Sequence, residues 1–298
     1  MEEASNKYKA GFIAILGAPN AGKSTLLNKM VGQKISITSK KPQTTRNRML
    51  GLITRLNCQY IFIDTPGIHR AKGVLNSKIV DSALSAISDA DVILFIADAF
   101  RSDLKSENIL LSRLNNIKKP VILALNKIDI IKKTALLPLI EKDFKDYPFK
   151  SIVPISAKHG TGLDILFAEI EKFMPKSHML FPEDAVTDMP MRFIAAEIIR
   201  EKVFRYTGEE IPYAVAVTIE SFKEYNRIDK IYAAIHVEKN SQKGIIIGKN
   251  GSKLVKIGTE ARKDIEKMTG KPAYLKLFVH VEKNWSNNTK ALLKFGYL

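Results

Sequence analysis

Residues 17–24 read Gly-Ala-Pro-Asn-Ala-Gly-Lys-Ser, which is the spacing of a phosphate-binding P-loop. Glycines let the backbone of such a loop turn its N–H groups towards phosphates, and the N-terminus of the following helix adds partial positive charge. In this spacing Lys23 would reach the β and γ phosphates of a nucleotide, and the Ser24 hydroxyl would bind Mg²⁺. The alternative is a glycine-rich turn that binds nothing. The predicted phosphate contacts in this stretch are Asn20, Ala21, Gly22, Lys23, Ser24 and Thr25.

The segments around this loop fit the same chemistry. Residues 12–16 are a short apolar run typical of a buried strand, and residues 24–30 begin a helical pattern. A second apolar run ends at Asp64, and an acidic residue at the carboxyl end of a strand in an open α/β sheet lies where ligands bind. We expect Asp64 to orient Mg²⁺ through water and the Gly67 N–H to contact the γ-phosphate. The alternative for this stretch is an ordinary Pro-Gly turn.

The choice of base depends on Asn126-Lys127-Ile128-Asp129, which directly follows an apolar strand at residues 121–125. The Asp129 carboxylate can accept hydrogen bonds from guanine N1–H and the exocyclic amine, whereas adenine would leave it unpaired. Asn126 would brace the neighbouring loops, and the Lys127 stem could lie over the base. Backbone N–H groups at residues 156–158, after the next strand, could meet the guanine carbonyl. The predicted guanine-binding residues are Asn126, Lys127, Asp129, Ser156, Ala157 and Lys158.

Strands and helices alternate along this part of the chain, which predicts a mainly parallel sheet with helices on both faces. The polar segment 35–48 has the composition of a loop, and either Thr44 or Thr45 is a candidate for a second Mg²⁺ ligand. The expected strands cover residues 12–16, 59–63, 92–97, 121–125 and 151–155, and the expected helices begin at residue 24 and cover 74–88, 107–114, 134–144 and 163–173.

A proline-containing segment, which we place at residues 176–190, lacks periodicity and predicts a linker after a nucleotide-binding domain at residues 1–175. Residues 191–298 are expected to form a small α+β domain that ends in a helix, with Trp285 as an anchor for that last helix. Its Gly248-Lys249-Asn250-Gly251 loop precedes an amphipathic helix and lies among lysines, as a backbone-clamping RNA site requires. The predicted RNA-binding residues are Ile247, Gly248, Lys249, Asn250, Gly251 and Lys253.

Composition limits the remaining classes of function. A formal net charge of +16 favours a polyanionic partner, either nucleic acid or an anionic membrane surface. The single cysteine, Cys58, excludes an internal disulfide and a cysteine-based zinc cluster. The polar start of the chain does not predict a secretory signal, and no apolar run approaches the roughly 20 residues that span a bilayer. We therefore expect a cytoplasmic protein.

The four nucleotide motifs in this order resemble those of TRAFAC-type GTPases, and residues 41–46 and 64–69 resemble the bacterial Era family specifically. In that family the Thr-Arg pair lies in the first switch, so the resemblance favours Thr45 over Thr44 as the Mg²⁺ ligand. Ile68 stands where Ras-like proteins carry a glutamine that orients water, which implies slow intrinsic hydrolysis, and we assign no catalytic residue. Asn20 resembles an asparagine that helps to bind K⁺ beside the phosphates in related GTPases.

The second domain resembles a type II KH domain, and residues 285–297 resemble the C-terminus of the Era family. This resemblance implies a molecular switch that binds GTP or GDP and the 3′ end of small-subunit ribosomal RNA, and that assists assembly of the 30S-type subunit. It also implies peripheral contact with the inner face of the cell membrane. The alternative is a regulatory GTPase at a membrane surface for which RNA is not the main partner. We expect a monomer.

Overall fold

The computed structural model describes residues 8–38, 48–64, 85–100, 103–115, 117–207, 211 and 215–296. The chain divides into two compact units, with the main boundary between Asp188 and Met189. Each unit is described by itself. In the part of the chain that the structure describes, no helix has both the length and the hydrophobicity needed to cross a membrane.

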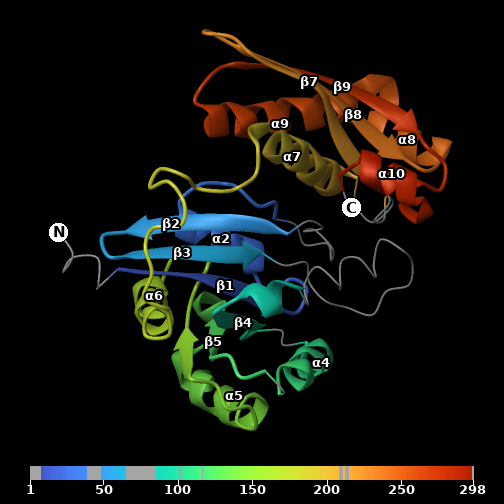
Figure 1. Ribbon diagram of the computed structural model, residues 1–298. Helices are drawn as coiled ribbons and strands as arrows, with labels where there is room; N and C mark the ends of the chain where they lie inside the picture. Colours follow the sequence, from blue (N-terminus) through green and yellow to red (C-terminus); the bar gives the residue numbers. More distant parts are fainter. Residues whose placement is uncertain are drawn as a thin grey trace. The chain divides into compact units, whose positions relative to one another are not determined.

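The first unit is built on a six-stranded sheet in the order β2-β3-β1-β4-β5-β6 (Figure 1). All neighbouring pairs are parallel except β2 and β3, which confirms the predicted mainly parallel sheet. The carboxyl ends of the parallel strands therefore meet at one edge, where ligands bind in such sheets. The strands are β1 (Lys9–Gly17), β2 (Met49–Arg55), β3 (Cys58–Asp64), β4 (Val92–Asp98), β5 (Val121–Asn126) and β6 (Ser151–Pro154).

Apolar side chains cover both faces of this sheet, because alternate strand residues point to opposite sides. On one face, Tyr60 and Phe62 of β3 contact the ring of Phe167 in α6. On the other face, Ile61 and Ile63 pack in a cluster with Ala86, which lies in a helical stretch at residues 85–89. The helices of this unit are α2 (Lys23–Val31), α4 (Leu104–Leu114), α5 (Leu136–Asp143) and α6 (Leu163–Glu171), with short 3-10 turns at Ile128–Ile130 and Lys133–Ala135.

Strand β2 is an element that the sequence pattern does not predict. It forms the antiparallel edge of the sheet, and its free side pairs with the predicted linker. The Leu50 N–H donates to Asp188 Oδ1 at 2.9 Å, and the Leu52 N–H donates to the Val186 carbonyl at 3.0 Å. Residues up to Asp188 therefore cover the edge of the first unit, which satisfies backbone groups that an open edge would expose.

The side chain of Gln59 in β3 binds the linker to the sheet at residues 180 and 181. Its side chain is fully buried. Its amide donates to Thr54 Oγ1 and to the Phe181 carbonyl at 3.0 and 2.8 Å, and its oxygen accepts from the N–H groups of Leu180 and Phe181 at 2.9 Å each. One polar side chain thus satisfies the backbone of a segment that has no regular structure of its own.

The second unit has a three-stranded sheet in the order β7-β8-β9, antiparallel between β7 and β8 and parallel between β8 and β9. Helices α7 and α9 lie along one face of the sheet and close the core (Figure 1). Lys202 of α7 joins Asp264 of α9 at 2.5 Å within this helical layer. The elements are α7 (Met191–Tyr206), β7 (Ala216–Glu224), β8 (Asp229–Val237), α8 (Asn240–Ile247), α9 (Ser252–Thr269), β9 (Ala273–Val281) and α10 (Thr289–Lys294), with 3-10 turns at Lys249–Gly251 and Trp285–Asn287.

Helix α8 is a second element that the sequence analysis leaves out, because Gly244 and three consecutive isoleucines do not show helical periodicity. Gln242 supplies the local signal: its side-chain oxygen accepts from the backbone N–H groups of Glu238 and Lys239, at 2.9 and 3.0 Å. At the other end of the unit, Trp285 is fully buried and packs edge-on against Phe295, as expected of an anchor for the last helix.

We predict that Gln59→Leu lowers the free energy of unfolding of the first unit by about 3 kcal/mol, because buried backbone groups of residues 180 and 181 lose their partners. Urea denaturation measures this loss, and limited proteolysis should show faster cleavage within residues 176–188. Gln33→Leu makes the same chemical change at an exposed position and serves as the control. Equal stability of the two variants would contradict the role given to Gln59.

Candidate nucleotide and nucleic-acid sites

The predicted P-loop connects β1 to α2 in a conformation that requires glycine at position 22. Gly22 has a φ of 106°, and a Cβ placed there would lie 2.3 Å from the side-chain nitrogen of Asn126. Asn20 also has a positive φ, 63°, which asparagine tolerates better than most residues. The loop therefore winds closely around the start of α2, where helix N–H groups favour an anion.

Lys23, the first residue of α2, turns its side chain back over the loop. Its Nζ donates to the carbonyl oxygens of Gly17 and Ala18 at 2.8 and 2.9 Å, and the residue is buried. Burial lowers the pKa of Lys23 to about 8, while the nearby Asp64 acts in the opposite direction. A buried ammonium held mainly by neutral carbonyls is stabilised by an added negative charge, as a phosphate would supply.

Asp64 is the last residue of β3 and lies beside β1 in the sheet, where it is fully buried. Its Oδ2 accepts from Ser24 Oγ at 3.3 Å and from Ser36 Oγ at 2.7 Å. Ser24 and Asp64, both predicted to act at Mg²⁺, therefore lie together. Ser36 is a neighbour that the sequence analysis did not identify, because a serine in a polar loop carries no signal by itself.

A hydroxyl and one carboxylate are hard oxygen donors, which fit Mg²⁺ because this ion keeps several waters and takes phosphate oxygens as further ligands. Among the residues described, no group of three or more His, Cys, Asp or Glu side chains could hold a metal ion. The donor set thus favours Mg²⁺ bound together with a nucleotide. Thr44, Thr45, Gly67 and Ile68 lie outside the described residues, so their roles stay predictions.

Asn126, at the end of β5, links two loops through its side chain. Its amide nitrogen donates to the Ala21 carbonyl of the P-loop at 2.8 Å, and its oxygen accepts from the Ala157 N–H at 2.9 Å. Asn126 is 2% exposed. Because β1, β5 and β6 run parallel in one sheet, the loops that follow them reach the same edge of that sheet, and Asn126 fixes their spacing.

The loop that follows β6 also holds Asp129 in place. Its Oδ1 accepts from Ser156 Oγ at 2.7 Å, and His159 Nε2 lies 3.7 Å from Oδ2. The Ser156 hydrogen bond lowers the pKa of Asp129 below its ordinary value, so the carboxylate is charged and acts as an acceptor. The Ser156 N–H donates to Thr161 and the Ala157 N–H to Asn126, which gives these two groups partners within the protein.

Lys127 adopts a left-handed conformation, φ 68°, and its ammonium pairs with Asp98 Oδ2 at the end of β4. The sequence analysis did not assign a role to Asp98. Its position was the available signal, because it ends the strand next to β5 at the ligand-binding edge. This ion pair fixes the ammonium end of the Lys127 side chain. The position of its alkyl stem over a bound base stays a prediction.

The Gly248–Gly251 loop of the second unit separates α8 from α9. Gly248, Asn250 and Gly251 have φ values of 70°, 52° and 78°. A Cβ at Gly248 would lie 2.7 Å from Lys253 Cβ, whereas one at Gly251 would meet nothing within 4 Å. Lys249 and Asn250 are exposed at the tip, and Ile247 packs against the core. The loop therefore presents backbone and a cation at the start of an 18-residue helix.

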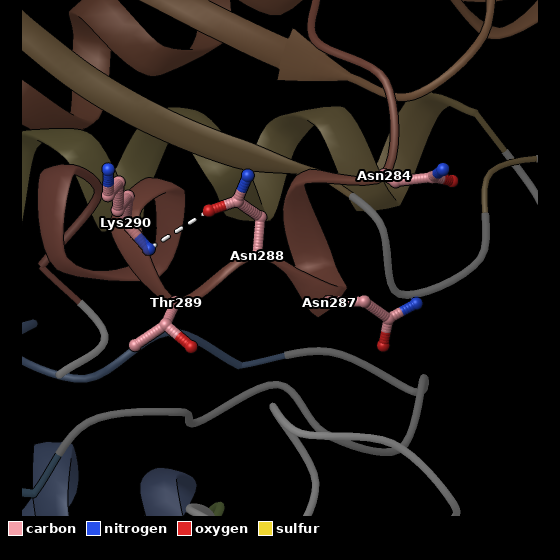
Figure 2. A pocket seen from close by; sticks show the side chains of 5 residues that line it. All are labelled: Asn284, Asn287, Asn288, Thr289 and Lys290. Atoms are coloured by element: carbon pink, nitrogen blue, oxygen red, sulfur yellow. Dashed lines mark hydrogen bonds between the residues drawn. The ribbon is translucent and has the colours of Figure 1, made fainter.

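A pocket in the second unit lies at the start of α10 and is lined by polar residues. Figure 2 shows Asn288 turned towards Lys290, whose backbone N–H it binds at 3.0 Å, so this asparagine caps the helix. The nucleotide-site residues described above belong to the other unit. The lining residues are Asn284, Asn287, Asn288, Thr289 and Lys290.

Comparisons with known proteins cover both units. A family model described as "50S ribosome-binding GTPase" matches residues 12–127, and a model described as "KH domain" matches residues 210–286. The chain is 51% identical to GTPase Era of Geotalea uraniireducens over 292 residues, which are 98% of each chain. It is 49% identical to GTPase Era of Geobacter metallireducens over 294 residues, covering 98% of this chain and 99% of the relative.

Two solved structures have the same fold over nearly the whole chain. One is a crystal structure of Era in complex with MgGDPNP and nucleotides 1506–1542 of 16S ribosomal RNA, with a TM-score of 0.92. The other is a variant of Aquifex aeolicus Era bound to GDP and AlF4⁻, with a TM-score of 0.91. Each is 43% identical to this chain and covers 97% of it, and this chain covers 99% of each.

We predict that Lys23→Ala weakens binding of a fluorescent guanine nucleotide by about two orders of magnitude or more, because the loop loses its buried charge-assisted donor. Lys29→Ala removes an exposed lysine from the same helix and should bind as the wild type does. Wild-type affinity in the Lys23→Ala variant would contradict the P-loop assignment.

We predict that Asp129→Asn shifts preference from guanosine towards xanthosine nucleotides, because the amide would present a donor where guanine also presents donors. Competition binding with both nucleotides measures the shift. Ser156→Ala provides the comparison: it removes the bond that orients Asp129, so affinity should fall while guanine remains preferred. Unchanged guanine selectivity in the Asp129→Asn variant would contradict the base-reading role.

Proposed function

Because the chain belongs to the Era family of GTPases, we propose that it is a GTP-hydrolysing switch whose second unit binds single-stranded ribosomal RNA during assembly of the small ribosomal subunit. The observation that supports the nucleotide part most directly is the Asn126 bridge. It joins the phosphate loop to the loop that orients Asp129, with hydrogen bonds of 2.8 and 2.9 Å. This bridge holds the two halves of the proposed guanine-nucleotide site at a fixed distance from each other.

Within this proposal, Lys23 neutralises the β and γ phosphates, and the N–H groups at the start of α2 receive their oxygens. Ser24, Asp64 and Thr45 of the first switch would hold Mg²⁺, which would neutralise charge on the phosphate oxygens. The γ-phosphate and Mg²⁺ would order the loops that carry Thr45 and Asp64, and hydrolysis would release them. Ile68 has no group that can orient water, which supports slow intrinsic hydrolysis and no assigned catalytic residue.

A K⁺ ion beside the phosphates is a further part of the proposal. Asn20 is exposed in the P-loop and has a positive φ, so its amide oxygen is available at the surface of the loop. Comparison of hydrolysis in KCl with NaCl at equal ionic strength tests it, and equal rates in both salts would contradict it.

The RNA part rests on the loop between α8 and α9. Its glycines permit close approach of a nucleic-acid backbone, and GxxG loops of this kind clamp about four nucleotides. The solved Era complex with nucleotides of 16S ribosomal RNA supports small-subunit RNA as the partner. The net charge of +16 favours a polyanion in general, and therefore also supports peripheral contact with an anionic membrane as a secondary property.

Two simple measurements address the remaining partners. Co-sedimentation with anionic vesicles, with and without RNA, tests the membrane contact, and strong binding that RNA does not displace would favour the membrane-surface alternative. Analytical ultracentrifugation tests the expected monomer.

We predict that Lys249→Asp with Asn250→Asp abolishes binding of an RNA that matches the 3′ end of small-subunit ribosomal RNA, while the GTPase rate is retained. Both positions are exposed, and aspartate tolerates the left-handed conformation of residue 250, so the fold should not change. We call this double substitution the loop variant. The control is Lys142→Asp with Lys145→Asp, which puts two aspartates at exposed sites of the first unit. Binding should be measured at fixed salt in GTP-analogue and GDP states.

Tight, sequence-selective binding only with the GTP analogue would support a nucleotide-gated RNA binder. Binding that survives in the loop variant, or that is equal for a scrambled RNA in every nucleotide state, would contradict the proposal.

A further inference from the structure

The sheet of the second unit has a face that points away from helices α7 and α9. On β8, Ile231, Ala233 and Ile235 belong to the core that these helices close, so the alternate residues of the strand point to the other side. The same alternation on β9 places Leu275 and Leu277 against the core. We call the opposite side the outer face; its residues on these two strands are Lys230, Tyr232, Ala234, His236, Tyr274, Lys276, Phe278 and His280.

The C-terminal segment covers only one end of the outer face. The ring of Phe295, just after α10, lies 4.3 Å from the ring of His236, which is 7% exposed. At the far end of the strands, Tyr274 is 46% exposed, and Lys230 and Lys276 are also exposed. The chain therefore covers the outer face at His236, and this face is open at Lys230, Tyr274 and Lys276.

The register arranges the open part of the outer face as alternating lysines and aromatic rings. Lys230 lies between Lys223 of β7 and Tyr274 of β9, and in the next row Tyr232 is beside Lys276. The ring centroids of Tyr232 and Tyr274 are 6.1 Å apart. Strands β7, β8 and β9 lie side by side in one sheet (Figure 1), and the alternation of side chains along the strands places both rows on its outer face.

The same rows concentrate positive charge. Lys223 and Lys230 are directly opposite each other on antiparallel strands, and like charges in that position destabilise a sheet. Within the described parts of the chain, no ion pair involves Lys223, Lys230 or Lys276. A bound polyanion would relieve the repulsion. The exposed ring of Tyr274 and the half-buried ring of Tyr232 lie beside these lysines, and aromatic rings are the platforms on which unpaired bases stack.

We propose that the open part of the outer face is a second contact surface for single-stranded RNA, in which Tyr232 and Tyr274 stack bases and Lys230 and Lys276 contact phosphates. The inference rests on the proposed RNA-binding function and extends it, because the GxxG loop belongs to the helical layer on the other side of the sheet. A duplex would use the lysines but would not expose bases to the tyrosines, so unpaired RNA is the occupant that uses both residue types.

The test uses the full chain and two unstructured RNAs, one of about six nucleotides that fits the GxxG clamp and one of about twenty that can extend beyond it. Tyr232→Leu with Tyr274→Leu, the ring-deletion variant, should weaken the longer RNA about tenfold or more and leave the shorter one unchanged, because one or two stacked bases are lost. Tyr232→Phe with Tyr274→Phe keeps both rings and should bind both RNAs as the wild type does. Circular dichroism and thermal melting confirm that each variant is folded.

The lysines are tested by salt dependence. Lys230→Gln with Lys276→Gln should reduce the slope of log affinity against log salt by about 1.4 for the longer RNA only, since each phosphate contact on a single strand contributes about 0.7. Ultraviolet crosslinking should attach the longer RNA to peptides that contain Tyr232 or Tyr274.

Wild-type affinity of the ring-deletion variant for the longer RNA would overturn the proposal, and so would a loss confined to the lysine variant, which indicates charge without stacking. Equal losses for both RNAs would also overturn it, since the effect would then lie at the clamp. A failure of the proposed RNA clamp at the GxxG loop would be detected separately, because the loop variant would then still bind the shorter RNA.

Discussion

The nucleotide site depends on one buried amide, the side chain of Asn126. It uses both ends of its amide at once, one on the P-loop and one on the loop after β6. Gly22 must lack a side chain for this contact to form, since a Cβ would lie 2.3 Å from the amide nitrogen. A single interaction therefore explains why a glycine on one loop and an asparagine on another are needed together, and why the parts of the site that read phosphate and base are coupled.

Around that amide lie two buried groups of opposite charge, Lys23 and Asp64. Lys23 is buried among carbonyl oxygens, and burial lowers its pKa to about 8. Asp64 is buried beside it, and hydroxyl groups of Ser24 and Ser36 donate to its carboxylate. Burying charged groups in a low-dielectric environment costs free energy. The arrangement becomes favourable when a ligand that carries its own charges binds beside them. Preorganisation of this kind is a property of a binding site more than of a structural core.

The second unit divides its surface in a comparable way. The helical layer carries the GxxG loop, whose positive φ angles expose backbone and Lys249 at the start of α9. The outer face of the sheet is closed at one end by the packing of Phe295 on His236. The segment that follows the last helix is therefore packed against the sheet of this unit.

The sequence by itself determined the class of the fold and the chemistry of the main site. Alternating apolar runs and helical patterns predicted the parallel sheet, and short-range motifs predicted Lys23, Ser24, Asp64 and Asp129, because each is defined by local spacing. The GxxG loop was found in the same way. These signals lie within a few residues of one another, so no knowledge of distant contacts was needed.

Tertiary structure decided what depends on contacts between distant segments. Strand β2 pairs with β3 along its whole length, and the linker, more than 120 residues later in the chain, pairs with its other edge. The sequence did not predict Ser36 or the outward row of Tyr232 beside Lys276 either, since nothing in a serine or a tyrosine alone reveals its neighbour. The position of Asp98 at the end of a strand was a signal, but its pairing with Lys127 was not. The physical reason is that hydrogen bonding and burial are satisfied globally, so a polar side chain acquires its role only when the chain brings its partner to it.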